Sequence, residues 1–128
     1  MVTETTQGVK VSVEVFFQDE YSNPLKSEFA FAYKVTIENS SDNTVRLVER
    51  HWHIFDSNGK RMEVKGKGVV GKQPVLEPGV VHQYVSGCQL NSDMGKMHGI
   101  YTMERLSDGS RFDVNIPTFE LIAPFKLS

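Results

Sequence analysis

The chain has 128 residues, a formal net charge of −2, 39% hydrophobic residues and 23% charged residues. These values are typical of one globular domain with an apolar core, and we expect a single domain over residues 1–128. They exclude a disordered chain. Because the chain has no strong positive charge, we expect no nucleic-acid partner.

The N-terminal segment, residues 1–7, has neither the basic stretch nor the apolar stretch of a secretory signal. No uninterrupted apolar run in the sequence approaches the length of a membrane span. We therefore expect a cytoplasmic protein that does not associate with membranes.

Alternation of apolar and polar residues predicts half-buried strands in the first half of the chain. Valines at every second position from Val9 to Val15 mark the first strand, and the residues from Phe29 to Ile37 mark the second. Val48, Trp52 and Ile54 mark a third strand, which ends at a turn over residues 56–59.

The second half continues with short strands over residues 61–64, 80–85, 99–104, 111–116 and 119–122. No segment has helical periodicity over a helical length. About seven short strands separated by turns predict an all-β fold, an antiparallel β-sandwich of immunoglobulin or fibronectin type III shape. The fibronectin-like variant is favoured because Cys88 is the only cysteine, which leaves no intrachain disulfide.

Histidines flank the tryptophan of the third strand. His51 and His53 share one face of this strand, and His82 approaches them if its strand is a neighbour. Imidazole nitrogens are transition-metal ligands, so these three histidines are a candidate metal site. The alternative is a solvated strand face, with Trp52 in the core and both histidines pointing away from it.

A glycine-rich segment over residues 66–74 spells GxGxxG and falls one residue short of a P-loop. Both nucleotide motifs require a following helix, which Pro74, Pro78 and Gly79 exclude. Backbone N–H groups in such a loop also form anion-binding nests without a helix, and lysines attract anions. The candidate anion-binding residues are Gly66, Lys67, Gly68, Gly71 and Lys72. The alternative is a crossover between strands in which Val69 and Val70 close the end of the sandwich.

Two further features suggest no catalytic site. Cys88 lacks an identifiable base, so a small structural thiol is the favoured interpretation. The aromatic residues follow strand periodicity and belong mostly to the core, with Phe16, Phe17 and Phe119 as a candidate exposed patch for a partner.

Several motifs, in order and at matching spacing, resemble the ApaG family. They are the glycine-rich run over residues 66–79, Trp52 within residues 51–54, and the segments 84–90, 95–103 and 112–121. The chain departs from the usual pattern at Lys67 and Lys72, where acidic residues are common, and over residues 91–93, where a Thr-Pro is typical.

The resemblance implies a fibronectin type III-like sandwich that occurs alone in bacteria and fused to other modules in some eukaryotic F-box and DNA-polymerase-interacting proteins. That distribution implies protein binding. It also implies an indirect association with cobalt and magnesium resistance, and a suggested pyrophosphate site at the glycine motif.

The leading hypothesis is a non-enzymatic protein-interaction module without a cofactor, whose protein partner is unidentified. The alternative is an anion-binding or divalent-metal-binding protein, and a phosphate-ester hydrolase is a third class. Because open sandwiches must protect their edge strands, homodimerisation through an edge is also an expectation.

Overall fold

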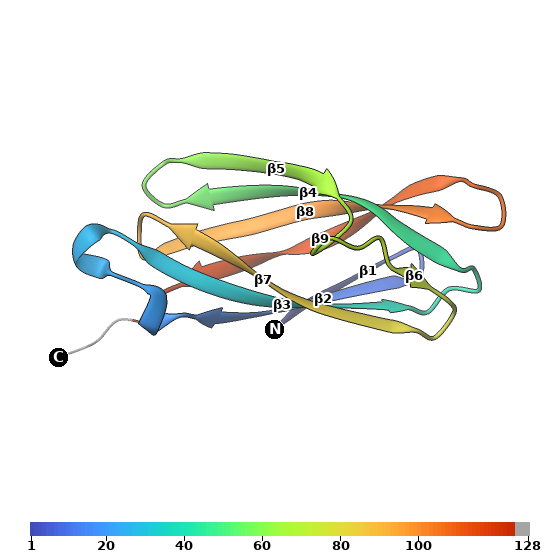
Figure 1. Ribbon diagram of the computed structural model, residues 1–128, viewed down its shortest axis with the longest axis horizontal. Helices are drawn as coiled ribbons and strands as arrows, with labels where there is room; N and C mark the ends of the chain where they lie inside the picture. Colours follow the sequence, from blue (N-terminus) through green and yellow to red (C-terminus); the bar gives the residue numbers. More distant parts are fainter. Residues whose placement is uncertain (125–128) are drawn as a thin grey trace.

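The computed structural model describes residues 1–124, which form two stacked antiparallel sheets (Figure 1). This arrangement confirms the predicted antiparallel β-sandwich. No helix among the described residues is long and apolar enough to cross a membrane.

The first sheet has four strands and the second has five. In spatial order the first sheet contains β1 (Val2–Thr6), β2 (Val9–Phe17), β3 (Phe29–Asn39) and β7 (Val81–Leu90). The second contains β5 (Arg61–Lys67), β4 (Val45–Asp56), β8 (Met94–Arg105) and β9 (Arg111–Ile122), and the short β6 (Val75–Leu76) also pairs with β4. Two single turns of 3-10 helix, η1 (Asp19–Tyr21) and η2 (Pro24–Lys26), connect β2 to β3.

The structure has nine strands within residues 1–124, more than the predicted seven or so, for identifiable reasons. β1 has no apolar alternation, and β6 has only two residues, so neither gives a sequence signal. The two strands predicted on either side of Pro117 are one strand, β9, whose register shifts by one residue opposite His98. This bulge accommodates the proline and changes which residues face inward, so Phe119 is buried and not exposed as predicted.

A bulge in β4 determines which of its residues face the core. The register against β8 shifts between Leu47 and Glu49, and both Leu47 and Val48 are buried. After this extra residue the even-numbered positions face inward, so Trp52 lies in the core. His51 and His53 therefore lie on the outer face of the second sheet.

Aromatic packing around Trp52 joins the two sheets. Its ring makes edge contacts with the rings of Tyr33 in β3, Phe119 in β9 and Tyr101 in β8, at centroid distances of 5.4, 5.8 and 6.3 Å. Trp52 is 3% exposed. Such edge-to-face contacts add to the burial of apolar area, and the contact with Tyr33 crosses from one sheet to the other.

The two sides of the sandwich differ. On one side β1 lies against β9, where the Asn115 backbone N–H donates to Thr6 Oγ1 and the Asn115 side chain donates to Glu4 Oε2. On the other side β5 and β7 are the last strands of their sheets. The glycine-rich loop, residues 68–74, runs between these two strands and then leads into β6.

Candidate functional site

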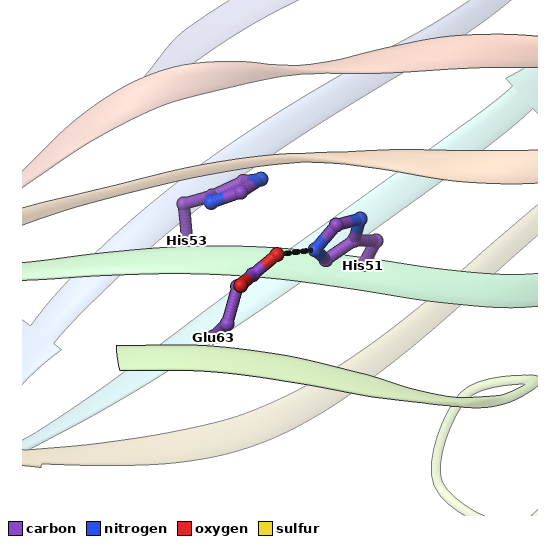
Figure 2. A group of neighbouring side chains, drawn as sticks. All are labelled: His51, His53 and Glu63. Atoms are coloured by element: carbon purple, nitrogen blue, oxygen red, sulfur yellow. Dashed lines mark hydrogen bonds and ion pairs between the residues drawn. The ribbon is translucent and has the colours of Figure 1, made fainter. Parts of the chain in front are cut away.

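A cluster of side chains lies on the outer face of β4 and β5. The two strands are paired so that His53 is opposite Glu63 and His51 is opposite Lys65. Figure 2 shows His51 and His53 projecting from β4 on the same side as Glu63 from β5. His51 Nε2 lies 2.5 Å from Glu63 Oε1, and the two imidazole rings are 4.5 Å apart. The ligand atoms of the three residues, which we call the His-Glu cluster, all lie within 4.8 Å of one another.

The electrostatics of the cluster keep Glu63 ionised. Its hydrogen bond with His51 is the largest influence and lowers the pKa of the carboxyl group, and positive charge on His51, His53 and Lys65 acts in the same direction. The ionised carboxylate can therefore accept hydrogen bonds or bind a cation.

His98 extends the row of imidazoles onto β8. It is paired with His53 across the strands, and the two rings stack at 4.9 Å with 14° between their planes. Burial lowers the pKa of His98, and the charges of His53 and Lys96 lower it further. A hollow of about 520 Å³ adjoins these residues, and Arg61 and Lys96 also line it. The surroundings of the cluster therefore carry positive charge.

His82 does not join the predicted metal site. It lies in β7, which pairs with β3 in the first sheet, and its ring is 6.4 Å from that of Tyr84. Burial and the charge of Lys72 lower the pKa of His82. The structure thus corrects the expected set, because it brings His51 and His53 together and places Glu63 beside them instead of His82.

The sequence contains a signal for Glu63 that the prediction missed. The turn at residues 56–59 connects β4 to β5. The Asp56 N–H donates to the Lys60 carbonyl, so the hairpin is centred on Asn58, and counting outward from Asn58 pairs Phe55 with Arg61 and His53 with Glu63. His98 could not be placed in this way, because β8 pairs with β4 across a long separation in sequence and a bulge.

Several backbone N–H groups of the glycine-rich loop are already hydrogen-bonded within the protein. The Gly68 N–H donates to the Val48 carbonyl, and the Val69 and Lys72 N–H groups donate to each other's carbonyls. Gly68 and Gly71 have positive φ angles of 61° and 74°. The N–H groups of Gly68, Val69 and Lys72 thus already have partners within the loop and β4.

Val69 and Val70 have different environments. Val69 is 2% exposed and belongs to the core, whereas Val70 is 63% exposed and does not, so the expectation that both valines close the sandwich is wrong for Val70. Val70 and Gly71 are the two central residues of a tight turn, with φ angles of 47° and 74°, as in a type I′ turn. A β-branched residue rarely adopts this left-handed conformation, so the turn holds an exposed valine under local strain.

Arg50 lies beside the glycine-rich loop. Its side chain faces the space between the sheets, and Nη1 donates to the carbonyls of Lys67 and Gly68 at 3.2 and 3.0 Å. A Cβ atom at Gly66 would lie 2.6 Å from Arg50 Nη1, so this glycine makes room for the guanidinium. No ion pair within the described residues involves Arg50.

Buried tyrosines lie beside Arg50. The hydroxyls of Tyr84 and Tyr101 are hydrogen-bonded to each other, and burial raises the pKa of both, as it does for Tyr33. A pocket of about 230 Å³ separates this group from the tip of the glycine-rich loop. Sequence periodicity placed the tyrosines in the core but gave no indication that Arg50 would face them.

β5 is exposed along nearly its whole length. Among the described residues it pairs with β4 alone, and every residue in it except Gly66 is exposed. Its inward positions, Met62 and Val64, lie opposite Ile54 and Trp52 but are 43% and 39% exposed. Its outward positions carry Arg61, Glu63, Lys65 and Lys67. β5 is thus a free sheet edge with one apolar face and one largely basic face.

Cys88 lies in β7 and is partly buried. Burial, followed by the charge of Asp56, raises the pKa of its thiol to about 11. The thiol is therefore protonated at neutral pH and is a poor nucleophile.

Comparison with protein families gives a match to the model of the ApaG domain over residues 19–105. Among curated proteins, a protein named ApaG from Brucella abortus is 46% identical over 124 residues, which cover 97% of this chain and 95% of that protein. A protein of the same name from Paramagnetospirillum magneticum is 47% identical over the same lengths.

Solved structures agree with this match. The crystal structure described as that of an ApaA protein from Bordetella pertussis superimposes with a TM-score of 0.87 at 39% identity, covering 91% of this chain and 94% of that chain. A protein from Archaeoglobus fulgidus, at 13% identity and a TM-score of 0.50, shares the fold alone.

Proposed function

The chain belongs to the ApaG family, and from this premise we propose that it is a non-enzymatic module that binds another protein along the free edge of β5. Unpaired N–H and C=O groups at a sheet edge bind an extended segment by adding it as a further strand. The observation that supports this proposal is the exposure of β5, which has a neighbour on one side only.

The two faces of β5 specify the chemistry of the partner. An added strand would place alternate side chains next to Met62 and Val64 and the others next to the outward residues Arg61, Glu63, Lys65 and Lys67. The first set is apolar and the second is mainly basic. The expected partner segment is therefore extended and alternates apolar with acidic residues.

The basic residues of β5 disfavour pairing of this edge with a second copy of the chain. Lysines on an edge strand oppose pairing with an identical edge, because like charges would face one another. β5 therefore favours a partner of opposite charge over a second copy of this chain, so the expected homodimer is the weaker alternative at this edge.

Affinity capture from the cells that encode the protein, with cross-linking mass spectrometry, tests the proposal. The double variant Arg61→Glu/Lys67→Glu reverses charge on β5 and leaves the His-Glu cluster in place. A matched control is Lys10→Glu/Lys26→Glu, which makes the same charge change on exposed residues outside β5. We expect the control to retain the captured protein, the β5 variant to lose it, and cross-links to involve Lys65. Retention by both variants contradicts the proposal.

Anion binding at the glycine-rich loop is a second candidate function, supported by the unpaired charge of Arg50 beside a pocket. Exposed Lys67 and Lys72 would add attraction. Because the Gly68, Val69 and Lys72 N–H groups already have partners, side-chain cations would carry most of the binding. Calorimetric titration with inorganic pyrophosphate should give heat that Arg50→Met abolishes and Lys10→Met leaves unchanged. No saturable heat from the wild type counts against this candidate.

A further inference from the structure

The His-Glu cluster shares Glu63 with the outward face of β5, but its two histidines lie on β4, and no residue of the glycine-rich loop belongs to it. His51 and His53 are half-buried on β4, and Glu63 projects from β5 toward them (Figure 2). The strand pairing and the bulge at Val48 hold these three side chains on one face of a sheet. Their convergence follows from the register and not from a flexible loop.

The donor atoms suit one class of cation. Two imidazole nitrogens and one carboxylate oxygen match borderline divalent transition ions, such as Zn²⁺, Ni²⁺ and Cu²⁺. Mg²⁺ prefers an octahedral set of oxygen ligands and keeps several of its waters. The set therefore selects imidazole-binding ions over Mg²⁺.

The distances require only small side-chain movements. In a tetrahedral site with bonds near 2.0–2.1 Å, neighbouring ligand atoms are about 3.3 Å apart. The present range, from 2.5 Å between His51 and Glu63 to at most 4.8 Å within the cluster, brackets this value. Rotation of the exposed Glu63 side chain opens the short contact without moving the backbone.

The residues around the cluster act on it in two ways: one stacks on a ligand, and the others add positive charge. His98 stacks on His53, which restricts rotation of the His53 ring. Arg61, Lys65 and Lys96 surround the cluster with positive charge, which weakens cation binding. Glu63 supplies the negative charge that offsets part of this repulsion.

We propose that His51, His53 and Glu63 bind one divalent transition-metal ion, with the remaining coordination positions open to solvent. Three protein ligands and an accessible face make a site that exchanges its ion and accepts an additional ligand. The proposal rests on side chains of the outer face and is independent of the proposed protein partner.

Zn²⁺ calorimetry and Cu²⁺ electron paramagnetic resonance on the isolated protein test this site. We expect one saturable Zn²⁺ site, no Mg²⁺ heat, and a Cu²⁺ spectrum with coupling to two imidazole nitrogens. His51→Ala, His53→Ala and Glu63→Gln should each weaken Zn²⁺ binding by about tenfold or more. The matched control is His82→Ala, which removes a histidine of the other sheet and should leave the affinity unchanged. Circular dichroism verifies that each variant is folded.

Three results would overturn the proposal. The first is no saturable Zn²⁺ binding by the wild type. The second is an equal loss in His82→Ala. The third is a loss in His98→Ala that exceeds the loss in Glu63→Gln, which would make His98 the third ligand. Because none of these measurements involves a protein partner, they leave the β5 proposal to its own test.

Discussion

Gly66 and Gly99 both lie where a methyl group would strike a neighbouring atom. A Cβ at Gly66 would lie 2.6 Å from Arg50 Nη1, whereas a Cβ at Gly99 would lie 2.2 Å from the His51 carbonyl oxygen. A guanidinium at the end of a flexible side chain can move, but the carbonyl of a central strand cannot. The requirement for glycine is therefore stricter at Gly99.

Gly99→Ala is expected to destabilise the protein by about 2 kcal/mol, because it forces apart the pairing of β4 and β8 beside Trp52. The matched control is Gly87→Ala in β7, where a Cβ would make an ordinary 3.4 Å contact with the Phe31 carbonyl. This control should change stability by less than about 0.5 kcal/mol. Urea denaturation of both variants measures the difference, and equal effects would contradict the steric explanation.

The Cys88 thiol should react slowly with alkylating agents in the folded protein. A pKa of about 11, compared with 9.0 for an unperturbed thiol, lowers the thiolate fraction about a hundredfold at neutral pH. The greater nucleophilicity of the more basic thiolate offsets part of this, so the net rate should fall about tenfold. Iodoacetamide labelling of folded and urea-unfolded protein, followed by mass spectrometry, measures the ratio. A similar rate in both states would contradict the buried environment.

Alkaline pH should unfold the protein through its buried tyrosines. Burial raises the pKa of Tyr33, Tyr84 and Tyr101 above the ordinary value of 10.0. The folded state therefore keeps protons that the unfolded state loses above pH 10, and stability falls as the pH rises through that value. Each hydroxyl contributes a slope of about 1.4 kcal/mol per pH unit while it stays protonated only in the folded state. Tyrosinate absorbance should rise together with loss of the β-sheet circular dichroism signal; ionisation of all tyrosines before unfolding would refute this.

At the scale of elements, the turn at the tip of the glycine-rich loop combines strain with exposure. Val70 has a left-handed conformation, with φ 47°, and its side chain is 63% exposed. The valine thus contributes little core burial to offset the backbone cost. Strained and exposed positions of this kind are more often kept for recognition than for stability.

Val70→Asn should raise the free energy of unfolding by about 1 kcal/mol, because Asn-Gly is the preferred sequence of a type I′ turn. Val85→Asn is the matched control, since Val85 is 60% exposed but lies in the regular strand β7. That control should be neutral or destabilising, because asparagine is unfavourable in strands. Thermal unfolding shows whether each variant is more or less stable than the wild type. A destabilising Val70→Asn would show that the valine makes contacts that outweigh the strain.

Elements with strong alternation could be predicted from the sequence, and irregular ones could not. β2 and β3 follow directly from the spacing of their apolar residues. The faces of β4 and β9 depend on bulges, which leave no local mark in a period-2 pattern. Two of the three residues of the His-Glu cluster, His51 and His53, could be predicted to share a face from their spacing alone. The stacking of His98 on His53 could not, because it depends on pairing between strands that are distant in sequence.

At the scale of the whole molecule, the two sides of the sandwich differ in protection. β4 and β8 each have paired neighbours on both sides, whereas β5 has one neighbour and is exposed on both faces. Figure 1 shows β5 at the margin of the molecule, away from β1 and β9. Stability should therefore decrease from the centre of the second sheet toward β5.

Native-state hydrogen exchange should follow this gradient. The amides of Arg61–Lys67 that do not bond to β4 should exchange first, and those of β4 and β8 should exchange only in global unfolding. Nuclear magnetic resonance measures the rates residue by residue. Protection of both edges of β5 in the isolated protein would mean that the edge is already occupied, for example by a second copy of the chain.

The extra residue at Val48 makes the surface of the second sheet sensitive to chain length and not only to composition. Deleting one residue there would exchange the two sets of β4 side chains, turning the imidazoles inward and the indole outward, a change that would otherwise need several simultaneous substitutions. Among relatives, a one-residue gap near this position would thus remove the histidine face even where every histidine is retained. Insertions in the turn over residues 107–110, between β8 and β9, would by contrast leave both faces of β4 unchanged.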